Sequence, residues 1–218
     1  MKPACLVIGA GPGIGHSVAQ AFARDGYDIA LAARHPARLL ELKPTLDKLG
    51  ATSRTYTVDA NDEASIRALF AAVRKDFGEP DVVVYNPAAH SPGKPTTLKA
   101  DALIADFRVN VLGALLWAQE AAAGMKERGH GTILLTGGGF AHEPAAAYAS
   151  LSLGKAALRN LTYTLAQELG AYGIHVATVT VYGFVQSGTH YDPARIAEAY
   201  LRLHRQAPGH FQTELVFK

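Results

Sequence analysis

The sequence predicts one α/β domain over residues 1–218, built on a doubly wound parallel sheet of six to seven strands with helices on both faces. Short apolar runs alternate with stretches of helical periodicity along the chain, which is the pattern of right-handed β–α–β crossovers. Several runs are apolar on both faces, as expected for strands covered by helices on two sides. The length of 218 residues suits one core and is short for two domains.

The expected strands are runs rich in Val, Ile, Leu, Ala or Thr, and the expected helices show apolar residues at helical spacing. The strands are expected at residues 4–8, 29–33, 52–58, 82–85, 132–136 and 175–181, with 214–217 as a seventh. The helices are expected at residues 14–24, 39–49, 66–77, 100–126, 148–169 and 193–206. Pro44 is expected to interrupt the second helix, because proline removes a helical hydrogen bond.

Composition excludes several classes of function. The net charge of +2 gives no reason to expect nucleic acid or an anionic membrane as partner. The single Cys5 excludes a disulfide framework and a cysteine zinc cluster, and no metal site is predicted. The start of the chain lacks the features of a signal peptide, and no apolar run approaches the ~18–20 residues that span a bilayer. We therefore expect a soluble, cytoplasmic protein that acts on a small molecule.

A glycine-rich loop joins the first strand to the first helix. Its members are Gly9, Ala10, Gly11, Pro12, Gly13, Ile14 and Gly15. Glycines here permit positive φ and let the backbone approach a pyrophosphate, while the helix N-terminus offers free N–H groups. Open parallel sheets bind ligands at the carboxyl ends of their strands. The loop therefore predicts a dinucleotide site; the alternative is a tight turn without a ligand.

The spacing Gly-x-x-x-Gly-x-Gly resembles that of the short-chain dehydrogenase/reductase family, which has a Rossmann-type fold. Further segments match the family in order along nearly the whole chain. They are Asp59 and Ala60 after the third strand, Asn86-Pro87-Ala88 after the fourth, Asn110 on a helix, Lys155 on the next helix, and Gly183, Val185 and Ser187 after the sixth strand. The resemblance implies that the loop and these positions, Asn110 apart, bind an NAD(P) cofactor.

Arg34 bears on the choice of cofactor. Enzymes with this fold that prefer NAD usually hold an acidic residue at the end of the second strand, where it takes the ribose hydroxyls. Here Ala33 is apolar and a guanidinium follows, and its fork of donors suits a 2′-phosphate. We therefore expect NADP(H) to be favoured over NAD(H); the alternative is a solvated arginine at a strand end.

The chain departs from the family at its usual catalytic Ser and Tyr. Counting back from Lys155 places the Tyr position at Leu151 and the Ser position at Gly138, so both hydroxyls are missing. Tyr148 lies seven residues before Lys155, two helical turns away, and therefore on nearly the same face. This spacing resembles that of the family's divergent branch, which includes enoyl-thioester reductases. There the Tyr contacts a thioester carbonyl and the Lys holds the cofactor ribose.

Tyr148, Lys155 and Asn110 are thus the candidate catalytic residues. Tyr148 would act as acid or carbonyl clamp; alternatively it packs on the preceding loop. Lys155 on an Ala-rich helix needs partners for its charge, and ribose hydroxyls would provide them. Asn110, by resemblance, holds a relay water and supports a kink in its helix. His90 and His142 are weaker candidates on loops at the ligand end of the sheet.

The substrate region is expected in the loops 86–97, 137–147 and 183–193, and the last is a short lid. Two functions remain open at this stage. The chain is an NAD(P)-dependent oxidoreductase acting on a carbonyl or enoyl substrate, or a catalytically weakened dinucleotide-binding protein that serves as sensor, scaffold or subunit. The resemblance also implies a homodimer or homotetramer that pairs through the helices at 100–126 and 148–169.

Overall fold

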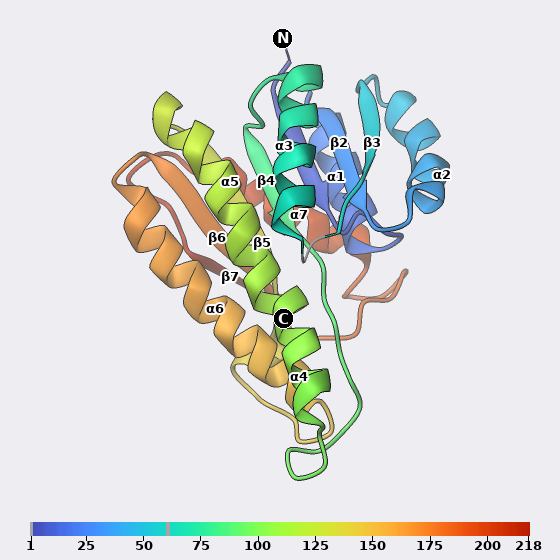
Figure 1. Cartoon of the computed structure of the whole chain (residues 1–218). Helices are drawn as coiled ribbons and strands as arrows, with labels where there is room; N and C mark the ends of the chain where they lie inside the picture. The colour runs from blue at the N-terminus through green and yellow to red at the C-terminus, as the bar shows by residue number, and fades with distance from the viewer. Residues whose placement is uncertain (1, 60–61) are drawn as a thin grey trace.

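The computed structural model describes residues 2–59 and 62–218. Within these residues, seven parallel strands form one sheet in the order β3-β2-β1-β4-β5-β6-β7 (Figure 1). The strands are β1 (Ala4–Ile8), β2 (Asp28–Ala33), β3 (Ser53–Thr57), β4 (Val82–Tyr85), β5 (Gly131–Gly138), β6 (Ile174–Val181) and β7 (Glu214–Phe217). The strand order reverses between β1 and β4, and such a switch point opens a crevice at the carboxyl ends of the strands.

Two helical layers cover the sheet. The helices are α1 (Ile14–Arg24), α2 (Pro36–Asp47), α3 (Glu63–Phe77), α4 (Ala100–Phe107), α5 (Gly113–Arg128), α6 (Ala149–Gly170) and α7 (Pro193–His204). Residues of α3, α5 and α6 share one core with the sheet, and residues of α1, α2 and α7 share the other (Figure 1). None of the described helices combines the length and the apolar character that crossing a bilayer requires.

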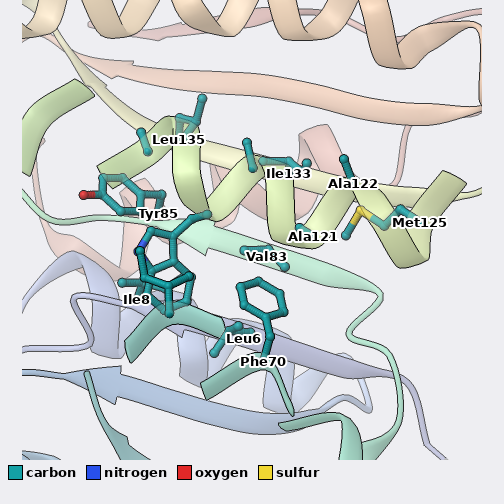
Figure 2. Close-up of a cluster of buried hydrophobic side chains, with 14 of the residues drawn as sticks. Leu6, Ile8, Phe70, Val83, Tyr85, Ala121, Ala122, Met125, Ile133 and Leu135 are labelled. Carbon is teal, nitrogen blue, oxygen red and sulfur yellow. The ribbon is translucent and has the colours of Figure 1, made fainter. Parts of the chain in front are cut away.

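Successive side chains of β1 point alternately into the two cores. Leu6 and Ile8 point into the α3–α5–α6 side, whereas Cys5 and Val7 point into the α1–α2–α7 side. Figure 2 shows the first of these cores, where Phe70 of α3 and Met125 of α5 lie against the strands. Burial of both faces of the strand explains why its run is continuously apolar, as the doubly wound prediction requires.

Two helices differ from the sequence prediction. Pro44 does not interrupt α2, which continues through it to Asp47. Pro44 is exposed, and the carbonyl that loses its helical partner belongs to the exposed Leu40, so solvent can satisfy it. The predicted helix at 100–126 is divided into α4 and α5 by a π-helical turn, η1 (Arg108–Leu112).

Candidate active site

Two cavities open at the carboxyl edge of the sheet. The β1–β2 cavity, of about 240 Å³, lies between the glycine loop and the end of β2. The β5–β6 cavity, of about 500 Å³, lies over the ends of β5 and β6 and against α6. Ala88, just after β4, lines both, and its neighbours Asn86 and Pro87 each line one. The segment after β4 therefore joins the two cavities into one continuous ligand edge.

The glycine loop forms a cradle at the start of α1. Gly13 has φ +112°, a conformation that L side chains rarely adopt, and no atom lies within 4 Å of the place where a Cβ would stand. A Cβ on Gly15 would lie 2.6 Å from the carbonyl oxygen of Gly9, so only glycine allows the helix to start this close to β1. No side chain caps the N-terminus of α1. The open space beside uncapped N–H groups fits the pyrophosphate of a dinucleotide.

Asn86 ties this loop to the centre of the sheet. Its Nδ2 donates to the carbonyl oxygen of Gly9 at 3.0 Å, and its Oδ1 accepts from Oγ1 of Thr136 at 2.9 Å. Pro87 packs on Gly9, since its ring atoms lie about 3.0 Å from a Cβ built there. Asn86 thus positions the loop by hydrogen bonds, and Pro87 does so by contact.

The end of β2 carries more positive charge than Arg34 alone. Arg34, His35 and Arg38 all line the β1–β2 cavity. Arg38 was not predicted from the sequence, although its place four residues after Arg34, in the first turn of α2, was the available signal. Asp59 is exposed and its backbone N–H donates a hydrogen bond to Ser65 Oγ, but Asp59 does not line the cavity, whereas the preceding Val58 does. Ala60 lies outside the described residues.

Lys155 is the buried cation of the β5–β6 cavity. Only 6% of its surface is exposed, and its Nζ donates to the carbonyl oxygen of Thr136 at 2.6 Å. Burial lowers the pKa of the ammonium group to about 8. The stem of Lys155 runs past Gly138, with Cγ 3.5 Å from the place of a Cβ. Gly138 and Leu151 both line the cavity, and neither brings a hydroxyl to it.

Tyr148 stands at the N-cap position of α6 and lines the same cavity as Lys155. Its ring stacks on Phe140, with the centroids 5.1 Å apart and the planes 20° from parallel. The ring of His90 lies 5.0 Å from it. Tyr148 therefore packs on the preceding loop and also faces the cavity, so both of its predicted roles are compatible with its position.

Asn110 does not line either cavity. It is buried in η1, where its Oδ1 accepts from the backbone N–H of Ala89 and its Nδ2 donates to the carbonyl oxygen of Ala89, each at 2.9 Å. Gly154 of α6 leaves the space that the Asn110 amide occupies. In this structure, Asn110 anchors the 86–97 loop and marks the irregular turn between α4 and α5.

The segment after β6 closes one side of the β5–β6 cavity. Gly183 lines the cavity and has no room for a side chain, because the ring of Tyr191 lies against it. Val185 also lines the cavity, whereas Ser187 is exposed and lines neither cavity. Tyr182 also lines the cavity and was not predicted from the sequence as a cavity residue.

A carboxylate outside the cavity holds the 137–147 segment in place. Glu214 of β7 accepts hydrogen bonds from Arg159 at 2.9 Å, Thr180 at 2.6 Å, His142 at 2.8 Å and Tyr163 at 3.1 Å. Burial alone would raise the pKa of Glu214, but these bonds, led by that from Arg159, lower it to about 2. His142, a candidate from the sequence, is thus bound to Glu214 and does not line the cavity.

Comparison with known proteins agrees with this geometry. The family model for short chain dehydrogenases matches residues 3–192. Glucose 1-dehydrogenase of Gluconobacter oxydans is 32% identical over 176 residues, which cover 80% of this chain and 66% of the relative. The 2,3-dihydro-2,3-dihydroxybenzoate dehydrogenase of Bacillus subtilis is 28% identical over 175 residues, covering 80% and 67%. The chain thus spans about two thirds of the length of these relatives.

Solved structures match over nearly the whole chain. A metagenomic short-chain oxidoreductase in complex with NADP superposes with a TM-score of 0.90 at 24% identity, covering 98% of this chain and 96% of that one. A short-chain type dehydrogenase/reductase of Mycobacterium marinum gives a TM-score of 0.89 at 25% identity, covering 99% and 93%. The chain belongs to the short-chain dehydrogenase/reductase family of oxidoreductases.

Proposed function

We propose that the protein is an NADP(H)-dependent oxidoreductase that transfers hydride to or from a carbonyl or enoyl substrate without the family's usual Ser and Tyr hydroxyls. The observation that carries the proposal is the adjacency of two cavities, one at the glycine loop and one that holds Lys155, on either side of Ala88. Such an edge suits a dinucleotide with a small substrate beside its reactive end.

The residues present fit the cofactor. The open cradle at Gly13 takes the pyrophosphate, and the β1–β2 cavity takes the adenosine half. Lys155, whose Nζ already donates to Thr136, has further N–H donors for the ribose hydroxyls. When bound, the nicotinamide supplies or accepts the hydride.

Selectivity for NADP(H) follows from the charges at the end of β2. Arg34 and Arg38 both line the cavity, neither forms an ion pair with a described residue, and Ala33 offers no carboxylate to the ribose. Two guanidinium groups favour a 2′-phosphate over a ribose hydroxyl. We infer that Arg38 acts together with Arg34.

Tyr148 is the residue we assign to the substrate carbonyl. Its phenol makes no hydrogen bond within the described part of the chain, although its ring is held by Phe140. A hydroxyl in the wall of an apolar cavity can donate to a carbonyl oxygen and stabilise the charge that develops there. Asn110 contributes by positioning: it fixes Ala89, and with it the segment that joins the two cavities.

A second function is favoured by Gly138 and Leu151. Both line the cavity where hydroxyls would be needed, so a cofactor-binding protein that serves as sensor, scaffold or subunit is the alternative. The test is NADPH oxidation by the purified protein with a panel of ketones, aldehydes and enones, alongside calorimetry with NADPH and NADH. Substrate-dependent oxidation supports the enzyme. Tight cofactor binding without turnover across the panel supports the alternative.

We also propose a homodimer or homotetramer that pairs through α5 and α6. Leu112, which leads into α5, is 42% exposed, and Leu153 of α6 is 53% exposed. Burying such side chains against a second copy would remove apolar surface from water. Analytical ultracentrifugation of the wild type and of Leu153→Glu tests this, with dissociation of the variant as the expected result. The cytoplasmic location stays a prediction.

A further inference from the structure

We propose that the β5–β6 cavity selects an apolar substrate with an aromatic frame beside its carbonyl, and that it rejects sugar-like polyols. The inference rests on the proposed function and names the substrate class of the same site. It is carried by two observations: the aromatic rings that line the cavity, and the hydrogen bonds that already occupy most of its polar groups.

The first set of rings is held rigidly. Phe140 and Tyr148 stack with centroids 5.1 Å apart, and His90 lies 5.0 Å from Tyr148. Phe140 belongs to the short helix η2 (Gly139–Ala141), and Tyr148 stands at the start of α6. Phe140 and Tyr148 line the cavity, whereas His90 does not. Because neighbouring rings fix their orientation, Phe140 and Tyr148 present a planar surface at little cost in conformational entropy.

The second set of rings comes from the segment after β6. The ring of Tyr182 lies against Gly139, with Cδ1 2.9 Å from the place of a Cβ, so glycine is required there to seat the ring. Phe184 lines the cavity and yet 77% of its surface is exposed, and its neighbour Val185 is 42% exposed. An apolar ligand in the cavity would remove this surface from water, which favours binding.

Several polar side chains of the cavity already form hydrogen bonds within the protein. Asn86 is bonded to Gly9 and Thr136, the Thr136 hydroxyl to Asn86 and Tyr200, and Lys155 to the carbonyl oxygen of Thr136. What remains is the cofactor-facing part of Lys155, two phenols, and one carboxylate. The phenols belong to Tyr148 and Tyr182; the carboxylate, Glu143, is 73% exposed and lies 3.6 Å from Lys218.

So few free groups cannot satisfy a polyol. Each buried hydroxyl without a partner weakens binding by about tenfold or more. An aromatic frame has no such requirement, and it gains from offset or edge-to-face contacts with the lining rings. The cavity therefore fits a ring with one carbonyl and few other polar groups.

The experiment compares two ketones that differ only in aromaticity. They are 1-(2-naphthyl)propan-2-one and its saturated decalin counterpart, in which a methylene separates carbonyl and ring so that intrinsic reactivities match. D-glucose serves as the polyol. We expect a KM for the naphthyl ketone about tenfold below that of the decalin ketone, and no turnover of glucose. Equal KM values, or a preference for glucose, would overturn the inference and leave the proposed function standing.

A variant links the preference to the cavity. Phe184→Ser should raise the KM for the naphthyl ketone about tenfold. Tyr172→Ser removes another exposed ring, 47% exposed, that lies beyond α6 and lines neither cavity, so the KM of this variant should equal that of the wild type. An unchanged KM in Phe184→Ser would contradict the inference.

Calorimetry with 1-(2-naphthyl)propan-2-ol, without cofactor, separates the two hypotheses. Binding that Phe184→Ser weakens, in a protein that turns over no ketone, would refute the proposed function and support the aromatic site. A protein that neither binds this alcohol nor turns over any ketone would refute both.

Discussion

The two ends of the ligand edge are built by different means. At the glycine loop, beside the β1–β2 cavity, the backbone geometry is what requires glycine: Gly13 takes a positive φ, and Gly15 allows the helix to approach Gly9. At the β5–β6 cavity, the chemistry depends on side chains, and Gly138 and Leu151 bring no hydroxyl. The spacing of the glycine loop resembles that of the family, whereas Gly138 and Leu151 stand where the resemblance predicts the family's Ser and Tyr.

This contrast separates binding from chemistry. A cradle made by backbone groups tolerates few changes, because each glycine is required by a conformation or a close approach. A catalytic cavity can take its hydrogen-bond donor from a different residue if the new side chain reaches the same cavity, as Tyr148 does. Cofactor binding and substrate turnover should therefore respond to different substitutions.

Gly13→Val should have the largest effect. The branched side chain would enter the space beside the N-terminus of α1 and strain a backbone at φ +112°. NADPH affinity, measured by calorimetry, should fall by about a hundredfold or more. Gly26→Val is the matched control, because Gly26 has φ +91° and equally open space but lies past the C-terminus of α1, away from the glycine loop. Comparable losses of affinity in both variants would show that backbone strain, and not the cradle, is responsible.

Tyr148→Phe tests the β5–β6 cavity at the other end of the ligand edge. The substitution removes one hydroxyl and keeps the ring that stacks on Phe140. We expect kcat for a ketone to fall about a hundredfold, the typical loss of one donor to a developing oxyanion, with KM and NADPH affinity nearly unchanged. Leu151→Tyr, which restores the family's hydroxyl beside Lys155, should raise kcat. Turnover of Tyr148→Phe at the wild-type rate would leave Tyr148 as a packing residue only.

Arg34→Ala should discriminate between the two cofactors. A charge-assisted hydrogen bond contributes about 1.5–3 kcal/mol, so NADPH affinity should fall about ten- to hundredfold and NADH affinity very little. Arg38→Ala should act in the same direction, since both side chains line the cavity. Arg202→Ala on the exposed surface of α7 is the control. Equal losses for NADPH and NADH would refute the assignment of a 2′-phosphate site.

The contrast between local backbone patterns and side chains that only the fold brings together also explains what could be predicted from the sequence. Continuous apolar runs such as that of β1 predicted a buried parallel sheet, and the structure confirms it. The family resemblance implied a kink at Asn110, but not that it would be the π-helical turn η1, because the form of this turn depends on Asn110 meeting Ala89 and Gly154 from distant parts of the chain. Local patterns determine strands and loops, whereas irregular turns depend on tertiary contacts.

The candidate site shows the same limit. The glycine loop was found from its place between the first strand and the first helix, and Lys155 from the family resemblance; the structure places both at the ligand edge. Arg38 and Tyr182 were missed, because only the fold brings the first turn of α2 and the end of β6 to the cavities. The roles assigned to the site residues stay predictions.

Lys155→Met should give the smallest of these effects, a change in the free energy of unfolding of the protein without cofactor. Burial lowers the pKa of Lys155 from 10.5 to about 8, so the folded state holds its proton less tightly than the unfolded chain does. Between these pH values the unfolded chain binds more protons, and the free energy of unfolding therefore rises with pH. At pH 7 the full penalty of the buried charge is present.

Met removes this charge but leaves the carbonyl of Thr136 without its donor. We therefore expect the free energy of unfolding of Lys155→Met to exceed that of the wild type by about 1–2 kcal/mol at pH 7. Urea unfolding of both proteins at several pH values measures it. The difference should shrink as the pH approaches 10.5, where the wild-type lysine is neutral in the folded state and the penalty disappears. A difference that does not change with pH would mean that packing, and not the buried charge, sets the stability at this end of the ligand edge.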